Sequence, residues 1–314
     1  KNKGGKVLNI YVWNDEFPAR FNDFYASKNP KLLEGVKVNF IQTPNQDNAY
    51  QNKLDEALMN QANAKDDEKV DIFCVEADYA LKYVDTAYTL DVMKDVGLKK
   101  KDVANQYQYT KDIMTDSKGK LKGVSWQSTP GGFVYRRSYA KQVLGTDDPV
   151  KVQAMLSDWN KFDEVAAKMK AAGYFMLSGY DDAFRAFADN IKSPWVKGNK
   201  IVIDPQINRW IEQTKTYTEK GYNNKASLWS AESTQGMMKN GKVFGYFAVG
   251  WFFDFCMPHG DGSAEGDWAI CEGPQGFSWG GTWICGAAGS DNVDIIKDVM
   301  MTLTSDTNTL KDIC

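Results

Sequence analysis

Residues 6–13 read KVLNIYVW, residues 36–42 read VKVNFIQ and residues 70–75 read VDIFCV. Each run is rich in β-branched and aromatic residues, which predicts a strand. The segments that follow them carry apolar residues at helical spacing, namely Phe17, Phe21 and Phe24 in the first helix, and Tyr50, Leu54 and Leu58 in the second. This alternation of strands and helices predicts a parallel, doubly wound α/β sheet with right-handed crossovers.

The second half of the chain contains two helices with clear end signals. Ser157 or Asp158 is expected to cap one of them, and the other combines an Asp204 cap, Pro205 at the first helical position and Gly221 at its end. A further four elements are predicted: a helix over 231–240, a strand over 242–249, a strand over 282–287 and a helix over 293–303. The residues from Gly250 to Gly281 are rich in glycine and aromatics.

Length and charge restrict the class of protein. A chain of 314 residues exceeds the usual size of one domain, so two lobes are expected. The net charge of -3 provides no basic surface for nucleic acid, and no apolar run is long enough to span a membrane. We expect the five cysteines to be small buried hydrophobic residues, because none is in CxxC spacing.

The sequence offers few candidates for catalysis. It has one histidine, His259, in a glycine-rich turn, and it contains no HExxH, Walker A or GxSxG motif. Ser138 to Lys141 matches SxxK and Ser290 to Asn292 matches SDN, but the accompanying KTG element is absent. A calcium loop at Asp261, Glu265 and Asp267 lacks the alternating spacing of ligands. We therefore predict no enzyme activity, no catalytic residue, no metal and no cofactor.

Polar and aromatic residues cluster after several predicted strands. Ligands of open α/β sheets bind outside the carboxyl ends of the strands, so these clusters are expected to meet in one cleft. Their members are Trp13, Asn14 and Glu16, then Glu76, Asp78 and Tyr79, then Trp126 and Gln127, and finally Trp251 and Phe252.

A sugar suits such a set of residues. Tryptophan and tyrosine rings can stack on the apolar face of a pyranose, while carboxylates and amides bind its hydroxyl groups. Only five arginines occur, and most lie on predicted helices, so a phosphate or polycarboxylate ligand is disfavoured. The sequence therefore predicts a neutral, hydroxyl-rich ligand.

Several segments together resemble the family 1 extracellular solute-binding proteins of ABC transporters. They are WNDEF after the first strand, VDIFCVEADY, the crossover at Thr129 and Pro130, SDWNKFDEVAAKMKAAGY, SAESTQGMMKNGKVFGYFAVGW and GGTWICGAAGSDNVDIIKDVM. Each segment alone is weak, and the last two are the most specific.

The resemblance implies a type II periplasmic-binding-protein fold, in which each of two lobes is a mostly parallel sheet flanked by helices and a hinge joins the lobes. The expected lobes are residues 1–130 with 280–314, and residues 131–279. The chain would normally continue past Cys314 with further C-terminal helices of the second lobe.

The resemblance also implies roles for individual residues. Asn14 and Glu16 would bind hydroxyl groups in the first lobe, and Trp251 would be the stacking platform of the second. Tyr180 and Asp181 are similar to a loop that reaches the ligand, and Trp283 would face the cleft.

The expected function is capture of an oligosaccharide for the permease subunits of an ABC importer, by a monomer. The opening KNKGGK reads either as a cytosolic start or as the tether left after a signal peptide is removed. With the excess of lysine over arginine, it suggests a lipoprotein on the extracellular face of a Gram-positive membrane, and a periplasmic location is the alternative. A binding protein for a peptide or polyamine remains open, as does a carbohydrate hydrolase that uses a carboxylate pair.

Overall fold

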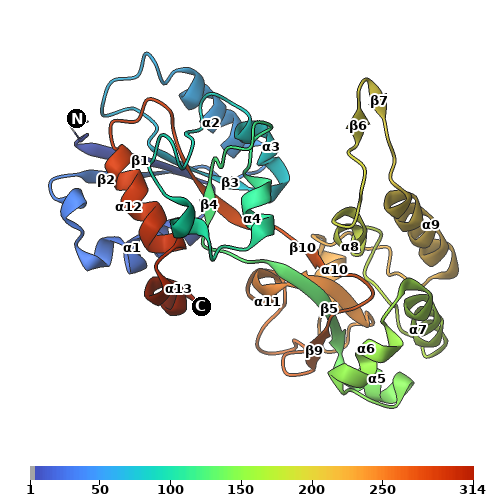
Figure 1. The fold of residues 1–314 in the computed structure, drawn as a ribbon. Coiled ribbons are helices and arrows are strands. Elements are labelled where there is room, and N and C mark those ends of the chain that lie inside the picture. The colour runs from blue at the N-terminus through green and yellow to red at the C-terminus, as the bar shows by residue number, and fades with distance from the viewer. Residues whose placement is uncertain (1–3) are drawn as a thin grey trace. The chain divides into compact units, whose positions relative to one another are not determined.

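The computed structural model describes residues 4–314, so the first three residues of the expected KNKGGK tether lie outside the described part. These residues form two compact units (Figure 1). The first unit holds the chain up to Ser128 together with Gly280–Cys314, and the second holds Thr129–Trp279. Each unit has its own hydrophobic core.

The first unit is built on a five-stranded mixed sheet. Its strand order is β2 (Lys37–Gln42), β1 (Val7–Val12), β3 (Ile72–Glu76), β11 (Thr282–Gly286) and β4 (Val124–Ser125). Strand β1 pairs in parallel with β2 and β3, which confirms the predicted start of the fold. Strand β11 runs antiparallel to both of its neighbours, β3 and β4.

The helices of the first unit pack their predicted apolar faces on this sheet. Phe17 and Phe21 of α1 are buried, as are Tyr50, Leu54 and Leu58 of α2. The helices are α1 (Glu16–Phe24), α2 (Ala49–Met59), α3 (Leu81–Val84), α4 (Gln108–Ile113), α12 (Val293–Thr304) and α13 (Thr307–Ile313). Short 3-10 turns add η1 (Ala26–Lys28), η2 (Lys31–Leu33), η3 (Ala77–Tyr79) and η4 (Lys100–Val103).

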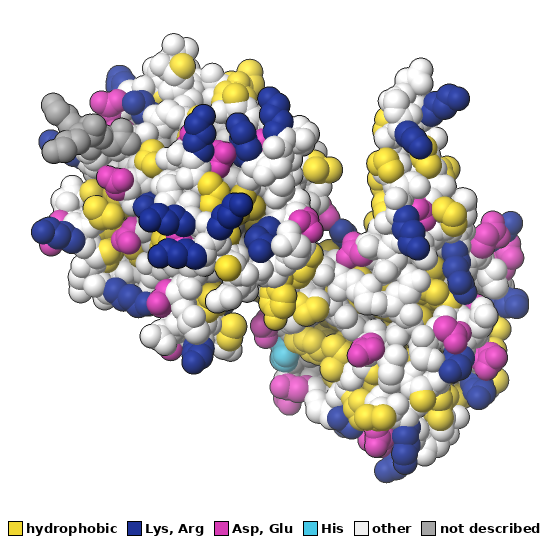
Figure 2. Space-filling model, viewed as in Figure 1, with side chains coloured by type: hydrophobic (Ala, Val, Ile, Leu, Met, Phe, Trp, Pro, Cys, Tyr) yellow, Lys and Arg dark blue, Asp and Glu magenta, His cyan; other side chains and the backbone are white. Residues whose placement is uncertain are grey.

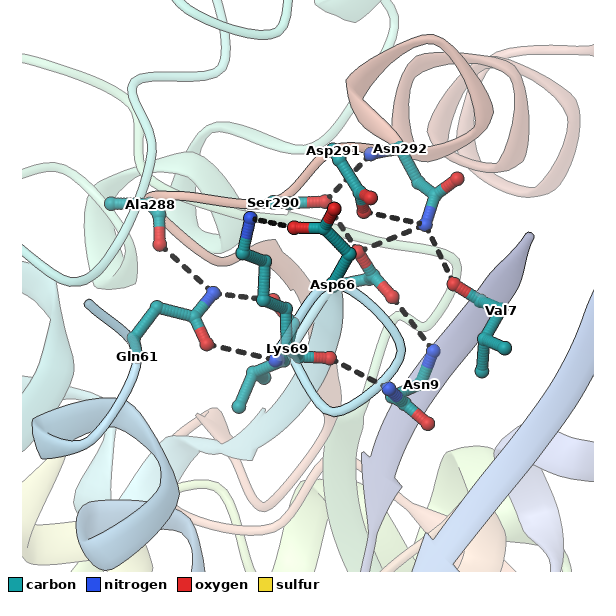
Figure 3. Close-up of polar contacts among 11 residues, drawn as sticks. Val7, Asn9, Gln61, Asp66, Lys69, Ala288, Ser290, Asp291 and Asn292 are labelled. Atoms are coloured by element: carbon teal, nitrogen blue, oxygen red, sulfur yellow. Dashed lines mark hydrogen bonds and ion pairs between the residues drawn. The ribbon is translucent and has the colours of Figure 1, made fainter. Parts of the chain in front are cut away.

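A buried carboxylate connects distant segments of the first unit. Asp71, just before β3, accepts hydrogen bonds from the Asn9 amide nitrogen (2.8 Å), the Ser290 hydroxyl (2.6 Å) and the Asn292 side chain (3.1 Å) (Figure 3). Burial raises the pKa of Asp71, and the hydrogen bonds oppose that shift. The SDN triplet at Ser290 therefore has a structural role, in holding the chain after β11 against β1 and β3.

The second unit is built on an antiparallel sheet, which differs from the mostly parallel sheet expected for this lobe. Strand β5 (Pro130–Arg136) pairs antiparallel with β8 (Gly245–Val249), β9 (Trp268–Cys271) and β10 (Phe277–Ser278). Parallel pairing occurs there as isolated bridges at Phe175 with Val243 and at Leu177 with Asn223.

The end signals of the two long helices in the second unit are confirmed. Asp158 caps α7 (Trp159–Ala171) through the Lys161 amide, and Asp204 caps α9 (Pro205–Lys220), which ends at Gly221 with a positive φ. The remaining elements are α5 (Arg137–Leu144), α6 (Pro149–Met155), α8 (Phe184–Ala188), β6 (Val196–Lys197), β7 (Lys200–Ile201), α10 (Ala231–Gly236) and α11 (Gly250–Phe255). Helix α10 is shorter than predicted, and the segment from 250 to 281, for which no element was predicted, contains the helix α11 and the strands β9 and β10.

Two of the five cysteines fit the expectation that they are buried. Cys74 and Cys285 lie in the core of the first unit, Cys256 and Cys271 are partly exposed, and Cys314 is exposed, contrary to that expectation. Burial raises the pKa of the Cys256 and Cys271 thiols to about 11, which disfavours their reactive thiolate forms. Within residues 4–314, no helix has the length and apolar character required to cross a membrane.

Candidate functional site

The predicted site residues of the first unit gather at one edge of its sheet. Strands β1, β3 and β4 end at this edge and β11 begins there, because β11 runs antiparallel to β3 and β4. Thr282 pairs with Glu76, and Trp283 pairs with Ser125. The residues that follow β1, β3 and β4 are therefore neighbours in space, as predicted from the strand ends.

Glu16 and Gln127 are held together at this edge. The Gln127 side-chain nitrogen donates a short hydrogen bond to the Glu16 carboxylate, and the Gln127 side-chain oxygen accepts one from the Thr282 amide (2.7 Å). Asn14 fixes the start of α1, because its side-chain oxygen accepts a hydrogen bond from the Glu16 amide (3.1 Å). Burial raises the pKa of Glu16, and the Arg20 guanidinium opposes that shift. Glu16 and Gln127 thus form a fixed pair with acceptor and donor groups.

The second cluster follows β3. The Glu76 carboxylate caps the turn η3 by accepting a hydrogen bond from the Asp78 amide (2.8 Å), and the Asp78 side chain is exposed. The Tyr79 ring is partly buried. Burial raises the pKa of its hydroxyl group, and the nearby Glu76 charge raises this pKa further. Tyr79 therefore contributes a ring to this edge, and Asp78 contributes a solvent-facing carboxylate.

Trp13 joins the two clusters through its ring. Its centroid lies 5.4 Å from that of Tyr50 and 6.1 Å from that of Tyr79, edge-on to both. Trp13, Asn14 and Glu16 lie close together at the end of β1, beside Cys74 and Thr282. The half-buried Trp13 ring thus sits beside the polar groups of this edge.

Two predicted aromatics of the first unit lie in its core. Trp283 is 1% exposed, and its indole nitrogen donates a hydrogen bond to the Thr110 carbonyl (2.8 Å). Trp126 is also buried and packs on Phe17, with 5.5 Å between ring centroids. Burial leaves Trp283 no side-chain surface for a ligand, which argues against the expectation that it faces one.

The second unit presents a cluster of three indoles at the end of β8. Trp251 follows β8, and Trp279 follows β10, whose Phe277 pairs with Gly131 of β5. The Trp251 indole nitrogen donates a hydrogen bond to the Trp279 carbonyl (3.0 Å), which fixes the orientation of its ring. Trp229 lies parallel to Trp251, with 7° between the planes and 6.2 Å between the centroids. We call Trp229, Trp251 and Trp279 the indole cluster.

The indole cluster is open to solvent at Trp229, whose side chain is 67% exposed. Trp279 is nearly buried and stands edge-on to both other rings, 5.9 Å from Trp229 and 4.8 Å from Trp251 between centroids. Trp229 therefore presents an open ring, the partly exposed Trp251 stacks parallel to it, and Trp279 supports both from the side. This arrangement offers flat apolar surface of the kind that stacks on a sugar ring.

Asp181 acts on the loop that carries Trp229. Its carboxylate accepts hydrogen bonds from the Ser227 hydroxyl (2.9 Å) and from the Leu228 amide (3.1 and 3.2 Å). Ser230 holds the other end of this loop, because it caps α10 and its amide donates to the Ser227 carbonyl (2.9 Å). These bonds occupy Asp181 with loop positioning, whereas it was predicted to contact the ligand.

The other predicted residues of the second unit differ in exposure. Tyr180 is exposed, and its carbonyl accepts a hydrogen bond from the Trp210 indole nitrogen (3.0 Å). Phe252 is fully buried in the core of the unit and, like Trp283, has no surface for a ligand. The sequence analysis missed Trp229 and Trp279. The serines on both sides of Trp229, Ser227 and Ser230, were the available signal, because they mark a loop in which a tryptophan is seldom part of the core.

The motifs considered for catalysis are occupied by structural contacts. The Ser138 hydroxyl donates to the Asp267 carboxylate (2.5 Å), which also accepts from the Arg136 guanidinium (2.9 Å). Burial raises the pKa of Asp267, but the hydrogen bonds from Ser138 and Arg136 outweigh it, so the pKa lies below its ordinary value. Glu265 accepts a hydrogen bond from the Gly260 amide (3.0 Å). Ser138 and the acidic loop thus brace the second unit.

The sequence profile of the bacterial extracellular solute-binding protein family matches residues 21–311. The chain belongs to this family. Members of this family are transporter solute-binding proteins, not enzymes, and they act in the periplasm or outside the cell. The resemblance noted from the sequence is thereby confirmed.

Solved structures similar to this solute-binding protein share its two-lobe fold. One, an extracellular solute-binding protein of family 1, has a TM-score of 0.78 and 17% identity, over 93% of this chain and 73% of that one. The galacto-N-biose/lacto-N-biose I-binding protein of Bifidobacterium longum has a TM-score of 0.73 and 15% identity, over 99% of this chain and 77% of its own. The sugar-binding protein MalE of Xanthomonas citri has a TM-score of 0.69 and 16% identity, over 95% and 74%. No curated protein sequence matches the chain.

The first unit of the solute-binding protein contains a hollow of about 830 Å³. It lies among α4, the ends of α12 and α13, and residues 125–128, and Cys314 is on its wall. It touches the candidate edge at Trp126 and Gln127. We assign it no ligand, because its lining otherwise consists of residues remote from the strand ends.

Proposed function

We propose that this solute-binding protein captures a neutral sugar or oligosaccharide and delivers it to the permease subunits of an ABC importer. The observation that carries this proposal is the indole cluster, in which Trp229 and Trp251 present parallel faces at the end of β8. The similar B. longum protein was solved with lacto-N-biose, a disaccharide, which agrees with a ligand of this class.

The polar edge of the first unit complements the indole cluster chemically. Glu16, Gln127 and Asp78 offer carboxylate and amide groups, which bind sugar hydroxyls with short, directional hydrogen bonds. We propose that one sugar molecule uses both sets of residues. Ligand-induced closure of the two units about a hinge follows from that proposal, since only a ligand that contacts both favours the closed state.

Isothermal calorimetry with a panel of oligosaccharides tests the proposal. The Trp251→Ala and Trp229→Ala variants should each weaken binding about tenfold, because each removes a stacking face worth on the order of 1.4 kcal/mol. Tyr88→Ala removes an exposed aromatic ring of the first unit beside the far end of β11, at the opposite edge of the sheet, and should leave affinity unchanged. If neither tryptophan variant alters the affinity, the indole cluster does not bind the ligand.

Glu16→Gln tests whether the two units share one ligand. The change keeps the shape of the side chain but removes its charge, so hydroxyl binding should weaken for the same sugar that loses affinity in Trp251→Ala. A Glu16→Gln variant with full affinity for that sugar would show that the two sets of residues do not bind the same sugar molecule.

A different ligand class would show itself in the same experiment. The carboxylates of the first unit would also attract a polyamine, and a carboxylate pair could serve a hydrolase. Thermal stabilisation by a polyamine but by no sugar would overturn the proposed ligand, and release of shorter sugars would overturn the proposed role in binding alone.

The proposed location is the extracellular face of a Gram-positive membrane, by a lipid anchor upstream of Lys1, with the periplasm as the alternative. Radiolabelled fatty acid incorporated into the full-length protein would support the anchor. Its absence from the purified full-length protein would count against it.

A further inference from the structure

A two-stranded hairpin extends from the second unit between α8 and α9 (Figure 1). Val196 of β6 pairs with Ile201 of β7, and Lys197 pairs with Lys200. Gly198 makes the turn with a φ of +64°. The Val202 amide donates to the Trp195 carbonyl (2.9 Å), which extends the pairing by one step.

Both faces of this hairpin are uncovered. Val196 and Ile201 share one face because they are directly paired, and Ile203 follows Ile201 by two residues on the same face. Their exposed fractions are 59%, 79% and 51%, and Trp195 is 46% exposed. No other stretch of similar length within residues 4–314 exposes as many large apolar side chains. An isolated two-stranded hairpin is at best marginally stable in water, so this surface is suited to being covered.

The charge of the hairpin is entirely positive. Residues 190–203 include Lys192, Lys197 and Lys200 and no Asp or Glu, although the whole chain has a net charge of -3. The acidic residue that follows, Asp204, is engaged at the base of the hairpin, where it accepts hydrogen bonds from the Lys192 and Ser193 amides. Figure 2 shows basic and hydrophobic side chains on the outer part of this projection. The tip therefore combines cationic, aliphatic and indole groups.

We propose that the β6–β7 hairpin docks on the surface of an anionic lipid bilayer. Lysine side chains are attracted to anionic headgroups, and tryptophan and aliphatic residues favour the boundary between headgroups and acyl chains. The chain as a whole has a small negative charge, so attraction to an anionic surface depends on local basic groups such as those of this projecting tip. This contact is separate from sugar binding and would keep the protein close to the membrane.

Cosedimentation with lipid vesicles tests this proposal. The protein should bind vesicles of mixed phosphatidylglycerol and phosphatidylcholine but not vesicles of phosphatidylcholine alone, and added salt should weaken the binding. Lys197→Glu/Lys200→Glu should reduce the partition coefficient at least about tenfold, since each lysine near the surface contributes a several-fold factor. Trp195→Ala should reduce it by a smaller factor that salt does not change.

A matched control separates the hairpin from the net charge. Lys118 and Lys120 flank Gly119 in an exposed turn of the first unit, so Lys118→Glu/Lys120→Glu changes the charge of the chain equally. This variant should retain vesicle binding, and the thermal unfolding midpoint and sugar affinity should show that all variants are folded.

Two outcomes would overturn the proposal. One is equal loss of binding in both double variants, which would mean that net charge alone matters. The other is absence of binding to the anionic vesicles at low salt, which would favour a protein partner for the hairpin, such as an acidic surface of the permease.

Discussion

The buried carboxyl group of Asp182 should make the stability of the second unit depend on pH. One of its oxygens accepts hydrogen bonds from the Ser178 amide (2.5 Å) and the Gly179 amide (3.1 Å), and the other is buried without a hydrogen-bond partner among the described residues. Burial, together with the neighbouring Asp181 charge, raises the pKa of Asp182 to about 8. The folded protein therefore holds a proton that the unfolded chain has lost at neutral pH.

The sign and size of the effect follow from proton linkage. The pKa of the folded state lies above the ordinary value of 3.8, so the contribution to stability is complete below pH 3.8 and is lost as the pH rises toward 8. The loss amounts to about 1.4 kcal/mol for each pH unit in this window, which is roughly 3 kcal/mol between pH 5 and pH 7.

Asp182→Asn should remove this dependence. The amide has the shape of a protonated carboxyl group, and its oxygen can accept the same bonds from Ser178 and Gly179. The free energy of unfolding is measured by urea titration at pH 5 and at pH 7. Its decrease from pH 5 to pH 7 should be about 3 kcal/mol larger in the wild-type protein than in the variant. Asp254→Asn, which alters an exposed carboxylate of the same unit, serves as the control and should retain the wild-type slope. Equal slopes for the wild-type protein and Asp182→Asn would refute the assignment of a raised pKa.

Three further substitutions test other parts of the structure. Asp71→Ala removes the acceptor of the buried Asn9 amide and Ser290 hydroxyl and one acceptor of the Asn292 side chain. It should lower the free energy of unfolding by about 2–4 kcal/mol in a urea titration, whereas a change below 1 kcal/mol would contradict the network. Trp283→Ala should cost about 3–5 kcal/mol of stability while the folded variant keeps its sugar affinity in calorimetry, and lost affinity in a folded variant would return Trp283 to the site. Asp181→Ala should weaken sugar binding several-fold through the loop of Trp229 but add little to Trp229→Ala, so additive losses in the double variant would indicate a direct contact.

Local signals predicted the elements that depend on neighbouring residues. Asp204, Pro205 and Gly221 define α9 because capping, a fixed proline φ and a positive glycine φ act within a few residues. The strands β1, β2 and β3 were found for the same reason, since their composition and the helices between them specify a parallel unit. Strand direction in the second unit depends on which distant segments pair, and no local pattern records that choice.

The gathering of polar and aromatic residues at one edge of the first sheet was predictable, but the exposure of each side chain was not. Residues after β1, β3 and β4 do meet, because strand ends of one sheet share an edge. Trp283 was misjudged because β11 is buried along its whole length, so alternation along the strand offers no exposed face. Trp229 was missed because its exposure depends on its loop, which is held by hydrogen bonds to Asp181. Asp181 lies nearly fifty residues earlier in the chain.

The position of β11 between β3 and β4 affects the order in which the protein can form. Strand β3 pairs with β11, and the ribosome makes β11 only after the entire second unit has been synthesised. During synthesis the second unit can fold as a continuous segment, whereas one edge of β3 stays unpaired until residue 286 emerges. An unpaired strand edge is prone to wrong association, so the newly made chain needs protection for the time required to make more than two hundred residues.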